Sequence, residues 1–302
     1  MADNAPKGPT SFATSLPFVQ GFYDPGTSTL SYLVVDRAAG RGVIIDPVLE
    51  LDVRNGRTST RAMDLLIAAA EGIKIDAVIE THAHADHLSA AALLRQRLGC
   101  RIVTGHAITT VQSTWGRLLN LGSGFIADGR QFDRIMGEGD HLAVGSLDLE
   151  FWDTPGHTPS CQTIVLRGQG RTAAFVGDTL FMPDYGTART DFPGGDAGTL
   201  YRSIRRVLAL PEDSVLFMCH DYCPGGRALA WECTVADQRR GNIHVKDGVD
   251  EDAFVAMRTA RDKTLSAPAL LLPAIQVNIR AGEFPEPEAN GVSFLKLPLN
   301  LI

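Results

Sequence analysis

The first part of the chain contains two patterns of apolar residues, one with strand periodicity and one with helix periodicity. Residues 30–36 (LSYLVVD) and 41–47 (RGVIIDP) are runs of β-branched and other apolar residues on either side of a short polar turn, which predicts a β-hairpin. Residues 60–72 instead place apolar side chains at helical spacing, at Met63, Leu65, Leu66, Ala69 and Ala70. We therefore expect a hairpin followed by a helix.

Strand and helix patterns continue to alternate as far as residue 221. Residues 77–81 (AVIET) predict a short buried strand, and residues 85–99 predict a helix that ends at Gly99. Beyond them, the pattern predicts a hairpin over 142–151, two strands joined by a glycine-rich turn over 163–178, a helix over 197–210 and a strand over 214–221. Two halves built alike predict an α+β fold in which two β-sheets pack face to face with helices outside.

The composition of the chain indicates a globular protein and disfavours several functional classes. The chain has 302 residues, 44% of them hydrophobic, which is enough to bury a core without disulfides. A net charge of -7 argues against sequence-independent nucleic-acid binding, which usually needs a basic face. The five cysteines contain no CxxC pair and fit a reducing compartment. Since neither a secretory signal nor a membrane-spanning run is visible, we predict a cytoplasmic protein that binds neither nucleic acid nor membrane.

Four metal-binding side chains fall within six residues, where a predicted strand gives way to a predicted helix. They are His82, His84, Asp86 and His87. Three further candidates lie at predicted strand ends or in a Gly/Pro turn, namely His157 (TPGHTPS), Asp178 (VGDT) and His220 (CHDY). Neutral imidazole and carboxylate groups suit both zinc and iron(II), and loops at strand ends can bring distant ligands together. These seven residues predict a metal site rather than separate histidines satisfied by hydrogen bonds.

The order HxHxDH, GHT, GDT and a final strand-end histidine resembles the metallo-β-lactamase superfamily, whose fold is an αββα sandwich. The resemblance runs from about residue 18 to about residue 240. It implies a catalytic domain over 16–245, preceded by a flexible N-terminus over 1–15 and followed by a C-terminal extension over 246–302 that packs on the domain.

The residues after Asp178 narrow the resemblance. ARTDF (188–192) and TLYRSI (199–204), together with THAHADH and CHDY, resemble persulfide dioxygenases and the related BigR-linked hydrolase-type proteins. That resemblance implies one iron(II) per subunit, held by His82, His157 and Asp178, and oxidation of glutathione persulfide or a similar small persulfide by O2 to sulfite and free thiol. It leaves four residues with catalytic roles such as orienting ligands or relaying protons, namely His84, Asp86, His87 and His220.

A glyoxalase II-like thioester hydrolase is the alternative. It would bind two zinc ions with the same residues, and Asp178 would bridge the two ions. Glyoxalase II normally carries a basic C-terminal domain, whereas residues 241–302 contain few positive charges, which disfavours this alternative. A non-enzymatic metal-binding role is disfavoured by the intact ligand set.

Four residues near the metal motifs are candidates for substrate binding, namely Tyr185, Arg189, Asp191 and Tyr222. The alternatives are a surface ion pair for Arg189 and Asp191, and packing for the tyrosines. Cys161 is expected to be either a reactive thiol at the pocket or, more in keeping with its type, a buried inert one. The sequence leaves open whether Asn278 and Arg280 reach the pocket mouth. The family resemblance implies a homo-oligomer.

Overall fold

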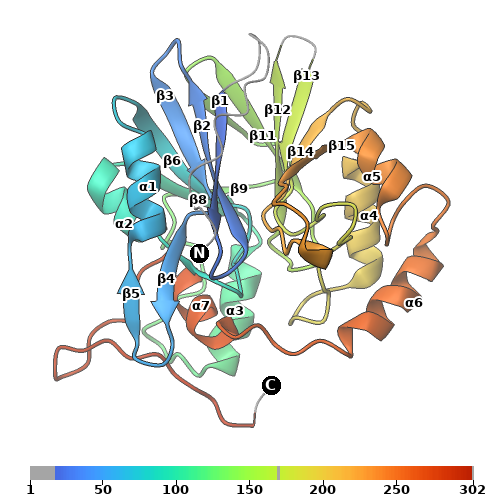
Figure 1. The fold of residues 1–302 in the computed structure, drawn as a ribbon. Coiled ribbons are helices and arrows are strands. Elements are labelled where there is room, and N and C mark those ends of the chain that lie inside the picture. Colours follow the sequence, from blue (N-terminus) through green and yellow to red (C-terminus); the bar gives the residue numbers. More distant parts are fainter. Residues whose placement is uncertain (1–17, 169–170, 301–302) are drawn as a thin grey trace.

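Two six-stranded β-sheets pack face to face at the centre of the computed structural model, which describes residues 18–168 and 171–300 (Figure 1). The first sheet has the order β1 (Phe18–Asp24), β2 (Thr29–Asp36), β3 (Arg41–Ile45), β6 (Lys74–Glu80), β8 (Arg101–Gly105) and β9 (Arg134–Met136). The second has the order β10 (His141–Val144), β11 (Leu147–Asp153), β12 (Gln162–Gly168), β13 (Arg171–Phe175), β14 (Val215–Phe217) and β15 (Glu232–Thr234).

The space between the two sheets is filled by apolar side chains from both. Val34 and Ile79 of the first sheet and Phe151 and Phe175 of the second are fully or almost fully buried in one cluster. Strands buried on both faces explain the continuous apolar runs in the sequence, such as LSYLVV, whose residues are all buried in β2. Burial of this kind is the main force that holds the sheets together.

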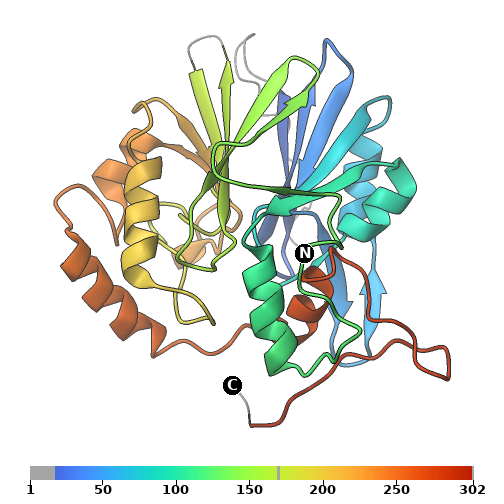
Figure 2. The same ribbon diagram turned by 180° about the vertical axis from the view of Figure 1, so that it is seen from behind.

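Helices cover the outer face of each sheet, as the two opposite views show (Figures 1 and 2). The first sheet is covered by α1 (Arg61–Ala69), α2 (Ala91–Leu98), α3 (Ile108–Leu118) and α7 (Leu271–Asn278). The second is covered by α4 (Ala197–Val207), α5 (Val235–Gly241) and α6 (Glu251–Asp262). The predicted αββα sandwich is therefore confirmed.

The predicted helix over 85–99 is wrong at its beginning, because α2 begins only at Ala91. Leu88–Ser89 form β7, which joins β4 (Val48–Asp52) and β5 (Arg57–Ser59) in a small third sheet. Contacts of β7 with β4 outweigh the local preference of this segment for helix. Residues 81–87 are thereby left as an irregular loop, called the metal loop below. The predicted N-terminus over 1–15 lies outside the described residues.

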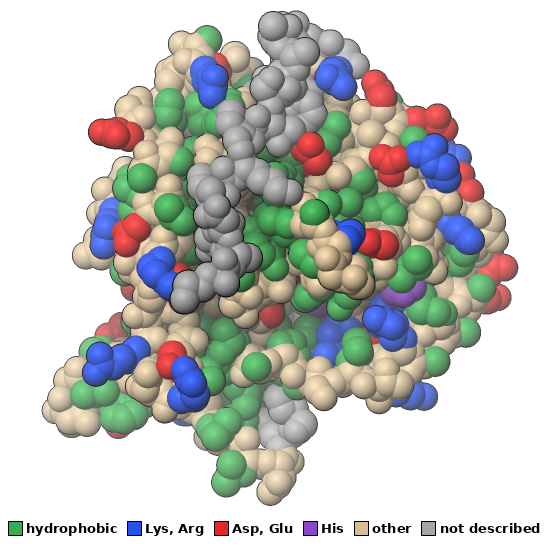
Figure 3. Space-filling model, viewed as in Figure 1, with side chains coloured by type: hydrophobic (Ala, Val, Ile, Leu, Met, Phe, Trp, Pro, Cys, Tyr) green, Lys and Arg blue, Asp and Glu red, His purple; other side chains and the backbone are tan. Residues whose placement is uncertain are grey.

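The chain ends in a long segment without regular structure after α7. Several of its large apolar side chains are exposed, namely Phe284, Val292, Phe294, Leu295, Leu297 and Leu299. Figure 3 shows hydrophobic side chains along the corresponding lower protrusion of the molecule. Within residues 18–168 and 171–300, no helix combines the length and the apolar character that a bilayer crossing requires.

Candidate metal centre

The predicted metal ligands all follow the carboxyl ends of strands. The metal loop begins directly after β6, Asp178 lies three residues after β13, and His220 lies three residues after β14. His157 lies in the loop after β11, which runs in the same direction as β13 because both pair antiparallel with β12. Because β14 also runs parallel to β13, the loops after all three strands leave the second sheet at one edge, and the proximity of His82 to Asp178 places the metal loop of the first sheet beside them.

A close approach of two backbones positions His157. Gly156 adopts φ +136°, and a Cβ atom at this position would lie 2.3 Å from Cα of Leu200 in α4. Only glycine permits this conformation and this proximity. The loop is therefore pressed against α4, and the next residue, His157, is directed toward the edge of the sheets.

Asp178 lies between two groups of ligands. On one side, Oδ2 of Asp178 lies 3.8 Å from Nε2 of His82 and 3.5 Å from Nε2 of His157. On the other side, Oδ1 lies 3.3 Å from Nε2 of His220, which is itself 3.3 Å from Oδ2 of Asp86. The first group, His82, His157 and Asp178, has the residue types and the separations that a metal ion between them would need. On the second side, His84, Asp86 and His87 form another such group.

Five buried atoms of this cluster have no hydrogen-bond partner. They are Nε2 of His82, Nδ1 of His84, Nε2 of His87, Oδ1 of Asp178 and Nε2 of His220. A buried polar atom without a partner is costly, and so many in one cluster are expected only where another group satisfies them. The residues present therefore fit a bound metal, which the orphaned nitrogen and oxygen atoms would ligate.

Neighbouring groups fix which nitrogen of a histidine faces the cluster. Nδ1 of His157 donates a hydrogen bond to the carbonyl of Arg189 at 2.7 Å, which leaves the lone pair of Nε2 directed at Asp178. Nε2 of His84 lies 2.9 Å from Oδ1 of Asp46 and leaves Nδ1 free for the metal. Such outer contacts hold ligands in place and tune the metal.

Neighbouring groups shift the pKa values of two histidines in the cluster in opposite directions. Burial, helped by His84 and His157, holds the pKa of His82 well below its ordinary value and keeps the ring neutral, as ligation requires. Burial would also lower the pKa of His84, but the carboxylate of Asp46 outweighs it and raises that pKa well above its ordinary value. His82 is thus held in the neutral form that ligation requires, whereas Asp46 favours the protonated form of His84, whose Nδ1 must release its proton before it can ligate a metal.

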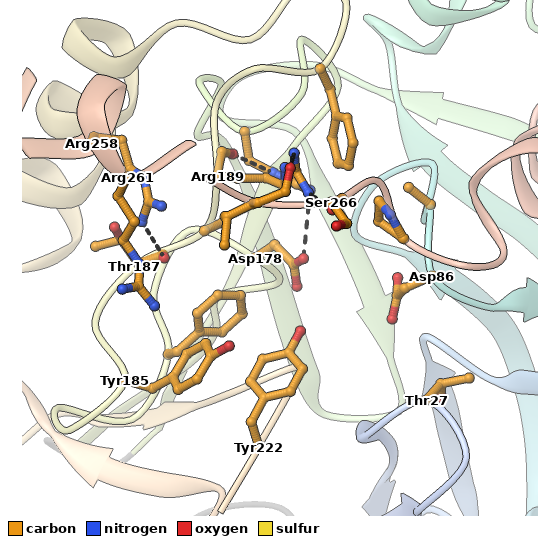
Figure 4. A pocket seen from close by; sticks show the side chains of 17 residues that line it. Thr27, Asp86, Asp178, Tyr185, Thr187, Arg189, Tyr222, Arg258, Arg261 and Ser266 are labelled. Carbon is orange, nitrogen blue, oxygen red and sulfur yellow. Dashed lines mark hydrogen bonds and ion pairs between the residues drawn. The ribbon is translucent and has the colours of Figure 1, made fainter. Parts of the chain in front are cut away.

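A pocket of about 300 Å³ opens beside Asp178 and His157 (Figure 4). The part of its lining that lies away from the metal ligands is called the pocket wall below and includes Tyr185, Arg189, Tyr222, Arg258 and Arg261. The wall combines positive charge with aromatic faces. This composition suits a small anionic molecule that carries apolar parts.

The four predicted substrate residues have different surroundings. The rings of Tyr185 and Tyr222 stack at 4.4 Å between centroids and line the pocket. The Arg189 side chain is already paired, at 2.6 and 2.7 Å, with both carboxylate oxygens of Asp191, and it donates to the carbonyl of Ser266 at 2.7 Å. Its contacts therefore shape the pocket and connect it to the segment between α6 and α7.

Cys161 is buried, and its thiol lies 3.1 Å from the hydroxyl of Thr158. Burial raises the pKa of Cys161 to about 12, so the thiol stays protonated and unreactive.

Two residues of the site, Asp46 and Arg258, are not evident from the sequence. Asp46 lies directly after β3 in a left-handed conformation (φ +49°) and accepts hydrogen bonds from both the backbone and the hydroxyl of Thr81 at 2.8 Å. Arg258 is almost completely buried and donates to the carbonyl of Thr187 at 3.1 Å. The only signal for Asp46 was a carboxylate at the end of an apolar strand, and Arg258 gave none because arginine is common on helix surfaces.

Comparison with known proteins gives consistent matches over this region. The model of the metallo-beta-lactamase superfamily matches residues 24–220. A probable metallo-hydrolase of Burkholderia pseudomallei is 55% identical and covers 94% of this chain and 99% of its own length. Glyoxylase B2 of Dictyostelium discoideum is 43% identical, with coverage of 94% and 97%.

A second group of relatives carries the name ETHE1, and one of them is named for a different activity. The mitochondrial persulfide dioxygenase of Mus musculus is 33% identical and covers 86% of this chain and 87% of its own length. The crystal structure of ETHE1 from Myxococcus xanthus superposes with a TM-score of 0.68 at 28% identity, over 88% of this chain and 99% of that one. Because the relatives carry different activity names, their similarity to this chain does not decide which reaction it catalyses.

Proposed function

Since the chain belongs to the metallo-β-lactamase superfamily, we propose that this metalloenzyme is a persulfide dioxygenase acting on glutathione persulfide or a similar small persulfide. The overall change is RSSH + O2 + H2O → RSH + HSO3⁻ + H⁺. The terminal sulfur is oxidised to sulfite, O2 is reduced, the S–S bond breaks and its inner sulfur leaves as the thiol. The relative named persulfide dioxygenase supports this choice of substrate.

The observation that carries the proposal is the group of His82, His157 and Asp178 at the pocket. One ligand atom from each lies within 4.8 Å of the others, and all three residues are buried. Two histidines and one carboxylate form the facial triad of non-haem iron sites, so these residues would hold one Fe(II). When bound, the iron supplies open positions for O2 and for a substrate sulfur.

The other residues of the site bind the substrate and control protons. Desolvation, with Asp178 and Asp86 nearby, holds the pKa of Tyr222 well above its ordinary value, so its hydroxyl remains a donor toward the pocket. Arg261 supplies the positive charge that a carboxylate of a glutathione-like substrate requires, whereas Arg258 is already paired with Asp262 at 2.6 Å and shapes the pocket. In this proposal Asp86, His87 and His220 would not ligate the iron but would orient water or move protons at the site.

A thioester hydrolase is the second candidate, because one specific observation favours it. Oδ1 of Asp178 lies 3.3 Å from Nε2 of His220, while Oδ2 faces His82 and His157, so Asp178 would be a ligand that two ions could share. The similarity to glyoxylase B2 agrees with this arrangement. A hydrolase would use two Zn(II) ions and a metal-activated water on a glutathione thioester.

The deciding experiment compares two substrates on enzyme loaded with each metal. The iron form is expected to consume O2 with glutathione persulfide and release sulfite, and Asp178→Asn is expected to abolish both. S-lactoylglutathione is the parallel substrate for the zinc form. Hydrolysis of this thioester without O2 uptake on the persulfide would overturn the dioxygenase proposal and leave the hydrolase.

We also propose that the chain acts as a homo-oligomer in the cytoplasm. The exposed apolar side chains of the C-terminal segment, including Phe294 and Leu297, support an association surface. All five cysteines are free thiols, which agrees with a reducing compartment. Light scattering of the purified protein tests the assembly.

A further inference from the structure

The side chain of Asn278, the last residue of α7, makes three hydrogen bonds to the backbone around the metal loop. Its Nδ2 donates to the carbonyls of His84 at 2.9 Å and His87 at 2.8 Å. Its Oδ1 accepts from the backbone N–H of Ser89 at 2.8 Å. Asn278 is only 5% exposed, so these bonds form away from water.

The metal loop depends on contacts of this kind because it lies between β6 and β7 and lacks regular secondary structure. Carbonyls of His84 and His87 that lost their donor would be buried acceptors without a partner, which is unfavourable. Asp86 lies between these two residues in the loop. A shift of the backbone here therefore moves three ligand candidates at once.

The loop is held by side chains from two separate segments of the chain. Asp46 binds its beginning, through Thr81 and the ring of His84. Asn278 binds its end, through the carbonyls of His84 and His87. The side chain of His84 and its own carbonyl are thus fixed by different parts of the chain.

The segment that carries Asn278 is packed closely against the loop. Gly282 adopts φ +87°, and a Cβ atom there would lie 3.0 Å from the carbonyl oxygen of Ser89 and from the amide nitrogen of Ala92. Residues 274–278 of α7 are all buried. Asn278 therefore approaches the metal loop on a rigid element, although it lies outside the region 24–220 that the superfamily model matches.

We propose that Asn278 is a positioning residue of the metal centre: the C-terminal extension completes the metal loop through this one amide and thereby sets the affinity for metal. The inference does not depend on the reaction, since the dioxygenase and the hydrolase both need the ligands of this loop. It assigns the extension a role in metal binding in addition to packing.

The test compares Asn278→Asp with Gln276→Glu. Gln276 is a matched control, because its buried amide on the same helix also makes three backbone hydrogen bonds, but to Leu272 and Lys296, away from the metal loop. Each substitution replaces an amide with an isosteric acid and removes two donor bonds. The dissociation constant for Co²⁺ is measured by chelator competition, together with the visible absorption spectrum of bound Co²⁺ and the thermal midpoint.

Asn278→Asp is expected to weaken Co²⁺ binding about 10–100-fold and to change the spectrum, as is usual when an outer contact of a metal ligand is lost. Gln276→Glu is expected to lower the thermal midpoint without either change. Equal effects of the two variants on Co²⁺ affinity, or wild-type affinity and spectrum in Asn278→Asp, would overturn the proposal. If Asn278→Asp does not fold, Asn278→Ala paired with Gln276→Ala decides by the same readouts.

Discussion

The metal centre and the pocket wall lie side by side but are built differently. The ligands of the metal centre come from the carboxyl ends of strands in both sheets and are almost all buried. The wall comes mainly from the loop after Asp178 and from α6, and its outermost member, Arg261, is exposed. The centre therefore has a rigid support of sheet, whereas most of the wall rests on one loop and one helix.

This difference suits two tasks, which are metal ligation at the metal centre and recognition of substrate charge at the pocket wall. A ligand is effective only within a narrow range of distances, which paired strands can maintain. Charge recognition at the wall tolerates movement, because a guanidinium attracts a carboxylate over several ångströms. Changes in the metal centre should therefore alter metal content and turnover, and changes in the wall should alter substrate affinity.

The largest effect is expected from removing a ligand of the metal centre. His157→Ala should lose bound iron and lower O2 uptake by about 10³-fold or more, because the proposed ligands act as a unit and loss of one disables the whole site. His106→Ala is the control, because His106 is an exposed histidine outside the motifs. Metal analysis and sulfite release give the readouts. An iron-loaded, active His157→Ala variant would contradict the assignment of His157 as a ligand.

A smaller effect is expected on the other side of Asp178. For a dioxygenase with a single iron, His220→Ala should retain the metal and lose about 10–100-fold in rate, as an outer residue would. For a di-zinc hydrolase, the same change removes a ligand and should be as severe as His157→Ala. The ratio of the rates of the two variants therefore distinguishes the two candidate functions. Rate and metal content are measured on the same preparation of each variant.

The metal centre was more predictable from sequence than the wall for a physical reason. Several histidines and aspartates at strand ends in one order are rare outside metal sites, so the combined set predicted seven candidates, whereas a single strand-end carboxylate such as Asp46 did not stand out. Arg258 and Arg261 could serve equally well on any helix surface, and only the packing of α6 places them at the pocket.

Contacts between distant segments explain the remaining differences. The helix predicted from residue 85 fails because pairing of Leu88 with Leu49 in β4 competes with it, and this pairing is not visible in the local sequence. Asn278 could not be assigned for the same reason, since its partners lie about 190 positions earlier in the chain. The αββα sandwich was predictable because apolar periodicity is a local property.

The wall predicts a change in substrate affinity with little change in turnover. Arg261→Ala should raise KM for glutathione persulfide about fivefold, the equivalent of about 1 kcal/mol for an exposed charge interaction, with kcat nearly unchanged. Arg261→Lys should retain most of the affinity. An alkyl persulfide without carboxylates should show no difference between the variants. A loss of kcat in Arg261→Ala would mean that the wall and the metal centre are not separable.

The smallest effect concerns the support of the wall by His244, whose Nδ1 accepts a hydrogen bond from the backbone N–H of Thr187 at 3.1 Å. Burial, followed by the charges of Arg258 and Arg261, lowers the pKa of His244 to about 4. In the unfolded chain a histidine has a pKa of about 6.5, so the unfolded state binds a proton first and the folded state loses stability as pH falls from about 6.5 toward 4.

Because solvent screens part of this interaction, we expect His244 to contribute about 1 kcal/mol to the loss of unfolding free energy between about pH 7.5 and about pH 5. His244→Gln keeps an acceptor for Thr187 but does not titrate, so its stability should depend less on pH by that amount. Urea unfolding of both proteins at the two pH values measures the difference, and the protonation of the metal ligands, common to both, cancels. Identical pH dependence would show that protonation of His244 does not weaken the wall.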